Sequence, residues 1–315
     1  MEALQTCFTT RGDSAGMRLG IAVVYLVLPG DVELVDLHLR YIERCTHVPF
    51  TLYAAANRLP TGLRDRLIAK PYVRVCSIPT TDLRSSFEHA HYLERLIATA
   101  IEDGVTHVVT LHVDSFPIRA GWATDLAARL SSRYSFAAIV RDEVRDPKPT
   151  TACLFLPREF YLRYQPKLLL SRTATRSAAG RNYVRHLANP KESGAGYGFL
   201  ALKEGLQWFP LRRTNLREDH YYFGSIHGDL IFHLGSAASE LRGFSGAREF
   251  PGMQRARRKA SLLLPRGLKE FLKVLIPQRI LHPESPTHQR AYSTVREALV
   301  EDPEGYLQYL RTGRR

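Results

Sequence analysis

Hydrophobic positions in the first 140 residues alternate between two spacings. Residues 20–28 form a continuous, largely β-branched run, which predicts a strand buried on both faces. Residues 31–45 follow with apolar side chains at a helical spacing. The alternation continues, with strands predicted at 50–57, 72–78, 106–114 and 135–140 and helices at 63–70, 85–104 and 121–132. Strands that alternate with helices predict an α/β fold, a mostly parallel sheet sandwiched by helices.

Beyond Arg141 the pattern is less regular. Residues 168–182 are rich in Ser, Ala, Gly and Arg, which predicts a mobile basic loop. A helix ending near Gly205, a strand at 207–211 and a short apolar run at 229–235 follow. The chain then becomes basic. We therefore expect a flexible tail over 1–18, a globular domain over 19–240 and a basic, mostly helical C-terminal extension over 241–315.

Composition is that of an ordinary globular protein, with 44% hydrophobic and 24% charged residues. No apolar run approaches the roughly 18 residues of a membrane span, and the first residues lack the pattern of a secretory signal. The four cysteines lie far apart, without a CxxC pair. They are typical of reduced thiols, so we expect a cytoplasmic protein.

The formal net charge of +13 calls for an acidic partner, and it is concentrated locally. Residues 251–282 hold eight basic residues and one acid, and so supply +7 of the total. Within them, residues 267–276 form a basic amphipathic pattern that suits an anionic membrane surface, which would place the protein at the inner face of the membrane. No aromatic–basic stacking motif is present, so no nucleic acid partner is expected.

A polar pair closes one of the predicted strands. His112 and Asp114 stand two residues apart at the end of the strand over 106–114. Residues at this spacing point to the same face of a strand, and open α/β sheets bind ligands outside the carboxyl ends of their strands. A cation that bridges phosphates commonly takes one or two protein carboxylates, so Asp114 is a candidate metal ligand. The alternative is that Asp114 only caps the turn into the next helix.

Two later positions are also candidates. Glu192 precedes the helix that ends near Gly205, where it is either a functional acid or a solvated carboxylate near a helix start. His233 closes the apolar run 230–232. A lone histidine in that setting is more often a satisfied core residue than a ligand.

Taken in order, these features resemble the inverting glycosyltransferases with the GT-A fold, particularly the large family 2 group. That family has a DxD-like motif at a strand end, an acidic residue opening a helix that ends in Gly, and a histidine closing a later strand. The segments VVTLHVDSFPIRAGWATDL (108–126), Glu192-Ser193-Gly194 with Gly205, and IFHLG (231–235) look like those elements. The resemblance implies that 19–240 is a nucleotide-sugar transferase domain.

The resemblance further implies transfer of a sugar from a nucleoside-diphosphate-sugar to an acceptor hydroxyl, with inversion. Asp114 would bind a Mn²⁺ or Mg²⁺ that holds the donor diphosphate, with His233 as a second ligand. Glu192 would be the general base. His112 stands where the family has its first acid, and is either a ligand that favours Mn²⁺ or a contact to phosphate or ribose.

Donor and acceptor binding follow from the same resemblance. The donor would contact Leu28, Pro29 and Asn57 at the ends of the first two strands. His89, near the start of the predicted helix over 85–104, would touch the nucleotide, or lie on a half-exposed helix face instead. The implied acceptor is a saccharide or a lipid-linked molecule.

Two rival functions remain open from the residues alone. His220, His227 and His233 lie close in sequence to acids, among them Glu218 and Asp219, and could serve a metal-dependent hydrolase, although no zinc spacing is matched. Within the transferase reading, Glu218 or Asp219 could replace Glu192 as base. The other rival is a basic protein that binds nucleic acid or a membrane surface without catalysis.

Overall fold

A computed structural model describes residues 16–26, 32–130, 133–142, 146–187, 189–235 and 285–314. Leu28, Pro29 and the basic segment 251–282 therefore lie outside the described residues. The chain divides into two compact units, one of Met1–Thr214 and Ile226–His233, the other of Asn215–Ser225 and Leu234–Arg315. The predicted boundaries at 18 and 240 stay predictions.

A seven-stranded sheet in the order β3-β2-β1-β4-β7-β6-β8 forms the centre of the first unit. Its strands are β1 (Leu19–Val24), β2 (Phe50–Ala55), β3 (Val73–Val75), β4 (His107–Leu111), β6 (Ala137–Arg141), β7 (Asp146–Pro157) and β8 (Phe209–Leu211). Four neighbouring pairs are parallel, and β7 runs antiparallel to both β4 and β6. The predicted α/β class with a mostly parallel sheet is confirmed.

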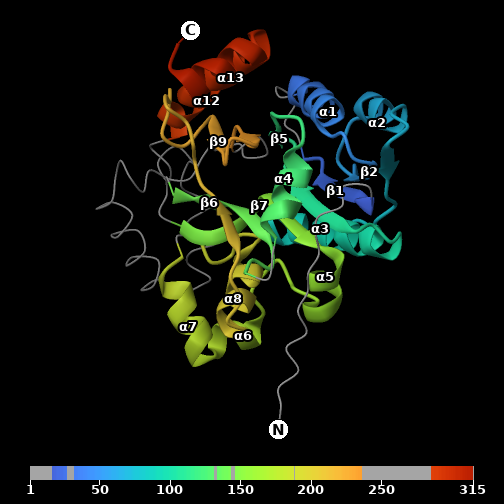
Figure 1. Cartoon of the computed structure of the whole chain (residues 1–315), viewed down its shortest axis with the longest axis vertical. Helices are drawn as coiled ribbons and strands as arrows, with labels where there is room; N and C mark the ends of the chain where they lie inside the picture. The colour runs from blue at the N-terminus through green and yellow to red at the C-terminus, as the bar shows by residue number, and fades with distance from the viewer. Residues whose placement is uncertain are drawn as a thin grey trace, which may run out of the picture. The chain divides into compact units, whose positions relative to one another are not determined.

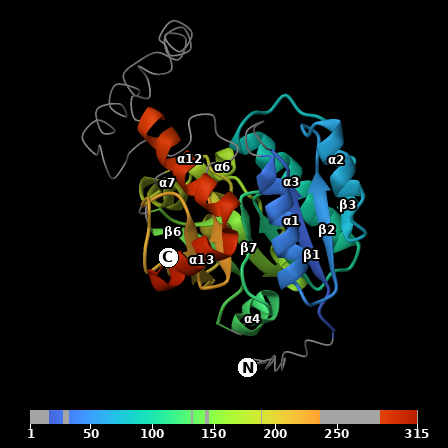
Figure 2. The same cartoon turned by 90° about the horizontal axis from the view of Figure 1, so that it is seen from above.

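Helices cover both faces of this sheet (Figure 1). Helices α1 (Glu33–Cys45) and α2 (Thr61–Ile68) connect β1, β2 and β3, whereas α3 (Ser86–Glu102) returns from β3 to β4. Since the two sets of crossovers run in opposite directions across the sheet, the right-handed rule places α3 on the face opposite α1 and α2. Figure 2 shows the same elements from above. Helices α4 (Trp122–Arg129), α5 (Arg158–Tyr164) and α8 (Ala195–Lys203) also belong to this unit.

The main core lies between α3 and the sheet. Leu93, Leu96, Ile97 and Ala100 recur at helical spacing on α3 and are buried, in one cluster with side chains of α5 and α8. Gly20 of β1 permits this close packing, because a Cβ there would lie 2.9 Å from the Cβ of Ala100. The hydrophobic periodicity of the sequence thus sets which face of α3 is buried.

A second, three-stranded sheet in the order β5-β10-β9 lies at the carboxyl end of β4. It contains β5 (Ser115–Pro117), β9 (Ser225–His227) and β10 (Ile231–His233). Strand β5 begins four residues after β4 ends, and β10 pairs with it in antiparallel register. The predicted strand over 106–114 therefore ends earlier than expected, at Leu111, and Asp114 lies in the turn between β4 and β5.

The predicted loop over 168–182 is wrong in part. Two short helices occupy it, α6 (Arg172–Arg176) and α7 (Ala178–Arg185). Ser171 and Ser177 explain the difference, because each hydroxyl accepts a hydrogen bond from a backbone N–H in the first turn of the helix that follows it. Serines that are typical of loops serve here as helix N-caps.

The second unit contains the helix pair α12 (Ser285–Glu301) and α13 (Pro303–Thr312). Asp302 caps α13 by accepting a hydrogen bond from the N–H of Gly305 at 3.0 Å, and Pro303 opens the helix. Val295, Leu299 and Leu310 are buried in this unit. Among the described residues, none of the helices combines the length and hydropathy of a membrane-spanning segment.

Candidate metal and transfer site

The turn after β4 is held in one conformation by Ser115. Its backbone N–H donates to the carbonyl of His112 at 3.0 Å, and its Oγ accepts from the N–H of His112 at 2.8 Å. The same hydroxyl donates to the carbonyl of Ala152 on β7. This tie fixes the backbone on both sides of Asp114 at the carboxyl end of the sheet, where open α/β sheets bind their ligands.

The pairing of β5 with β10 brings a third side chain to this turn. His233 lies opposite Ser115 in the register, so its Nε2 is 3.8 Å from Oδ1 of Asp114. Nδ1 of His112 lies 4.0 Å from the same oxygen. One ligand atom from each of these residues lies within 4.8 Å of the others, and no second group of this kind occurs among the described residues. One carboxylate and two imidazoles suit Mn²⁺ better than Mg²⁺.

Both histidines of this group are neutral at physiological pH. Burial lowers the pKa of His112, and it outweighs the opposite effect of the charges on Asp114 and Glu192. Burial also lowers the pKa of His233 well below its ordinary value, and the positive charge of Arg141 adds to the shift. A neutral imidazole keeps a lone pair on one ring nitrogen, which is the form that binds a metal.

Glu192 lies beside a buried lysine near this group. Nζ of Lys148, which is fully buried on β7, is 2.7 Å from Oε2 of Glu192 and also pairs with Asp146. Burial raises the pKa of Glu192, but the charges of Lys148 and of the buried Arg141 outweigh it, so the net shift is downward. Glu192 is therefore ionised at neutral pH. The side chain is one-third exposed, at 33%, and so remains accessible from solvent.

His89 belongs to the same cluster of side chains. Its ring on α3 meets the ring of His112 edge-on at a centroid distance of 5.1 Å, and its Nδ1 lies 3.4 Å from Oγ of Ser193. Burial, followed by the nearby His112, lowers the pKa of His89 to about 3. The structure thus joins residues 89, 112, 114, 192 and 233, which are distant in sequence, around the carboxyl end of β4.

Asn57 has a structural contact of its own. It follows β2, and its Nδ2 donates to the carbonyl of Ile78 at 2.8 Å, which ties together the segments after β2 and β3. The two other predicted donor contacts, Leu28 and Pro29, lie outside the described residues.

The rival histidine cluster does not assemble as one metal group among the described residues. His220 belongs to the second unit, where its Nδ1 accepts from the N–H of Tyr222 at 3.1 Å and its ring stacks on Phe223. Asp219 in the same unit accepts from the hydroxyl of Tyr309 at 3.2 Å. His227 is buried in the first unit, with its ring centroid 6.4 Å from that of His233.

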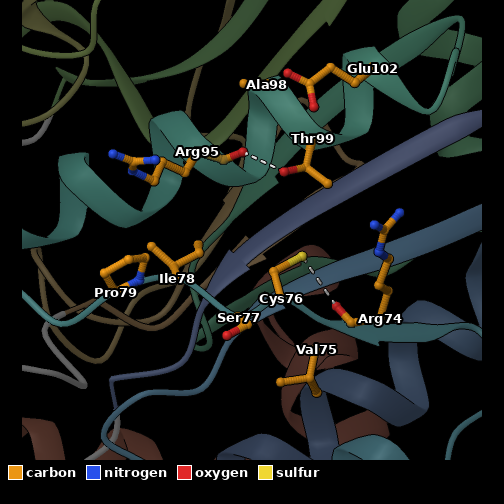
Figure 3. Close-up of a pocket in the computed structure, with 10 residues that line it drawn as sticks. All are labelled: Arg74, Val75, Cys76, Ser77, Ile78, Pro79, Arg95, Ala98, Thr99 and Glu102. Atoms are coloured by element: carbon orange, nitrogen blue, oxygen red, sulfur yellow. Dashed lines mark hydrogen bonds between the residues drawn. The ribbon is translucent and has the colours of Figure 1, made fainter.

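A cavity of about 470 Å³ lies elsewhere in the first unit, between α3 and the segment after β3 (Figure 3). Its lining residues are Arg74, Val75, Cys76, Ser77, Ile78, Pro79, Arg95, Ala98, Thr99 and Glu102. None of these is a predicted site residue, and Arg74 is already paired with Asp103. The cavity therefore adds nothing to the candidate site.

The sequence patterns did not predict four side chains that lie in or beside this group, namely Arg141, Lys148, Thr151 and Ser193. Residues 148 and 151 lie on β7, whose first four residues, Asp-Pro-Lys-Pro, do not have the pattern of a strand. The spacing of Asp146 and Lys148 could have indicated this pair, because two residues that are two positions apart share a face of a strand and these two carry opposite charges.

No family model and no curated protein matches this sequence. Among solved structures, the chain is similar to the mannosyltransferase PcManGT from Pyrobaculum calidifontis in complex with GDP-Man and Mn²⁺. The two are 15% identical, the match covers 51% of this chain and 50% of that chain, and the TM-score is 0.36. It is similar to a putative nucleotide-diphospho-sugar transferase from Desulfovibrio desulfuricans, at 10% identity, 62% and 80% coverage and a TM-score of 0.38. A cytidylyltransferase from Leptospira borgpetersenii matches at 13% identity, 67% and 81% coverage and a TM-score of 0.40.

The alignment spans about half of PcManGT, 50%, and 46% of the glycosyltransferase GlyE from Streptococcus pneumoniae. Likenesses of this size support no conclusion about activity, which has to rest on the geometry of the site.

Proposed function

We propose that this protein is a glycosyltransferase that moves a sugar from a nucleoside-diphosphate-sugar to an acceptor hydroxyl with inversion and with the help of a divalent cation. The observation that carries the proposal is the group of His112 with the buried Asp114 and His233 at the carboxyl end of β4, with the ionised Glu192 nearby.

The residues present suit a diphosphate-bound cation. Asp114 supplies the charged ligand atom, and His112 and His233 supply neutral nitrogens, so Mn²⁺ is preferred and Mg²⁺ is the weaker alternative. When bound, such a cation neutralises the negative charge that develops on the departing nucleoside diphosphate. Arg141 is buried, and its positive charge acts on His112, His233 and Glu192. It would favour the same diphosphate.

Glu192 is proposed as the general base. An ionised carboxylate can accept the proton of the acceptor hydroxyl as that oxygen attacks the anomeric carbon. Lys148 keeps Glu192 ionised and restricts its orientation through the contact at 2.7 Å. Glu218 and Asp219 are the alternative bases. Both are exposed, and Asp219 contacts Tyr309.

We further propose contacts to the donor, a class of acceptor and a cellular setting. Leu28, Pro29, Asn57 and His89 would contact the donor nucleotide, and the contact of His89 with His112 supports its place in the site. The acceptor would be a saccharide or a lipid-linked molecule. A cytoplasmic protein with residues 251–282 on an anionic membrane surface is the proposed setting, argued from the charge of that segment alone.

The test is thermal stabilisation and donor turnover across a panel of nucleoside diphosphates and their sugars, with Mn²⁺, Mg²⁺ or chelator. We expect one nucleotide to stabilise the wild type only with the cation, and Asp114→Asn to abolish that stabilisation. Asp125→Asn removes a carboxylate charge from an exposed residue paired with Arg119 and should leave it intact. If no nucleotide stabilises the wild type under any condition, the transferase proposal is wrong.

A further inference from the structure

A string of hydrogen bonds leads away from His112 on the side opposite Asp114. Nε2 of His112 lies 3.0 Å from Oγ1 of Thr151 on β7, and this hydroxyl lies 2.9 Å from Oγ of Ser193. Ser193 in turn lies 3.4 Å from Nδ1 of His89 on α3. Thr151 is 1% and Ser193 5% exposed, so solvent does not compete for these contacts.

The direction of this string decides which nitrogen of His112 can bind a metal. A neutral imidazole carries one N–H and one lone pair. Nδ1 of His112 faces Asp114, so this nitrogen must be the bare one for His112 to act as a ligand. The carboxylate of Asp114 favours the opposite arrangement, with the proton on Nδ1. A buried acceptor for the proton on Nε2 is therefore needed.

Thr151 and Ser193 can supply that acceptor. Oγ1 of Thr151 accepts from Nε2–H of His112 and donates its own proton to Oγ of Ser193. Ser193 then donates to the bare Nδ1 of His89. With this direction each hydroxyl in the string donates once and accepts once, so no buried polar atom of the string is left unsatisfied.

We propose that Thr151 and Ser193 are positioning residues that hold His112 in its Nε2–H tautomer, so that Nδ1 presents its lone pair beside Asp114 and His233. The inference rests on the proposed metal-assisted transfer, in which His112 is a metal ligand in place of the first acid of the family motif. Hydrogen-bond partners of metal-bound histidines typically change metal affinity by about 10–100-fold.

Mn²⁺ binding to the full chain tests the proposal, with a matched pair of threonine variants. Thr151→Val keeps the shape of the side chain and removes the acceptor, and we expect about 10–100-fold weaker Mn²⁺ binding. Thr150→Val makes the same change at the neighbouring buried residue, whose Oγ1 has no hydrogen-bond partner among the described residues, and should leave affinity unchanged. Thr151→Ser should restore affinity, and Ser193→Ala should give an intermediate loss.

A second measurement needs no metal. The ¹⁵N shifts of the His112 ring, assigned by their loss in His112→Gln, report the tautomer directly. We expect a bare Nδ1 in the wild type and in Thr151→Val a shift toward the Nδ1–H form. An unchanged tautomer in Thr151→Val, or unchanged Mn²⁺ affinity, overturns the role of Thr151. If the wild type binds no Mn²⁺, the proposed metal site is wrong, and the tautomer alone then decides the role of Thr151: a shift toward Nδ1–H in Thr151→Val supports it and an unchanged tautomer overturns it.

Discussion

At the scale of single residues, a buried lysine is paired with two carboxylates in this site. Lys148 is fully buried between Asp146 and Glu192. Removing an ammonium group from water costs several kcal/mol unless it is paired, so the two carboxylates and the lysine depend on one another. The same pairing keeps Glu192 ionised, which is the form that a general base requires.

Glu192→Gln tests the base at this scale. The amide keeps the size of the side chain and cannot accept the proton, so we expect turnover to fall about 10²–10⁴-fold while stabilisation by nucleotide and Mn²⁺ persists. Glu204→Gln, at a residue paired with Lys203 on the surface, is the control. A larger loss of turnover in Glu218→Gln or Asp219→Asn than in Glu192→Gln would move the role of base to that residue.

Lys148→Met tests the pairing. The change leaves Asp146, which is 2% exposed, without its cation, so we expect the free energy of unfolding to fall by about 3–5 kcal/mol. Lys203→Met, at an exposed residue, should change it by less than about 0.5 kcal/mol. Urea unfolding monitored by circular dichroism gives both numbers. Equal stability of the two variants would mean that the buried lysine does not hold the carboxylates.

At the scale of elements, β7 and the start of α8 carry the residues that meet at the site. Thr151 lies on β7, and Ser193 and Glu192 immediately precede the N-cap of α8 at Gly194. Gly194 has a φ of 103°, and a Cβ there would lie 2.2 Å from the carbonyl oxygen of Pro149 on β7. This close approach of two backbones sets the distance between Thr151 and Ser193.

Gly194→Ala should therefore disturb both stability and the site. We expect a loss of about 2–4 kcal/mol, from backbone strain and the clash with Pro149, together with weaker Mn²⁺ binding. Gly62→Ala in α2 is the matched change, since a Cβ there meets nothing within 4 Å, and it should stabilise by about 0.5–1 kcal/mol. Thermal and urea unfolding compare the two. A neutral Gly194→Ala would show that the backbones can separate without cost.

For the molecule as a whole, histidines whose pKa values are lowered in the fold couple folding to pH. The pKa values of His38, His89 and His227 are each lowered to about 3, with burial as the main cause. In the unfolded chain they return to about 6.5. The unfolded state therefore binds more protons at any pH between these values, and folding stability falls as pH decreases from about 6.5 toward 3.

We predict a free energy of unfolding that is level above about pH 6.5 and falls below it, by up to about 1.4 kcal/mol per pH unit for each of these histidines. Urea titrations between pH 8 and 5 measure this slope. His38→Gln should reduce this slope by the contribution of one histidine, whereas His47→Gln, at an exposed residue, should leave the slope unchanged. A stability that stays level down to pH 5 would contradict the burial of neutral imidazoles.

Much of the first half of the fold follows from local patterns. The helical stripe of α3 and the apolar run of β1 are visible in the sequence because each element buries one face or both faces in a regular period. Strand β7 is different, since its prolines obscure the strand pattern and one of its two partners, β4, is supplied by a distant segment. The helices α6 and α7 were missed because serine favours both loops and N-caps.

The sequence by itself determined the alternation of strands and helices over the first 140 residues and the place of Asp114 after a buried strand, since both depend on residues a few positions apart. Only the tertiary structure decided that His233 stands beside Asp114, through the register of β5 and β10, and that Lys148 lies against Glu192. These contacts join residues far apart along the chain. The spacing of hydrophobic residues specifies which face of a segment is buried, but not which distant segment will pack against it.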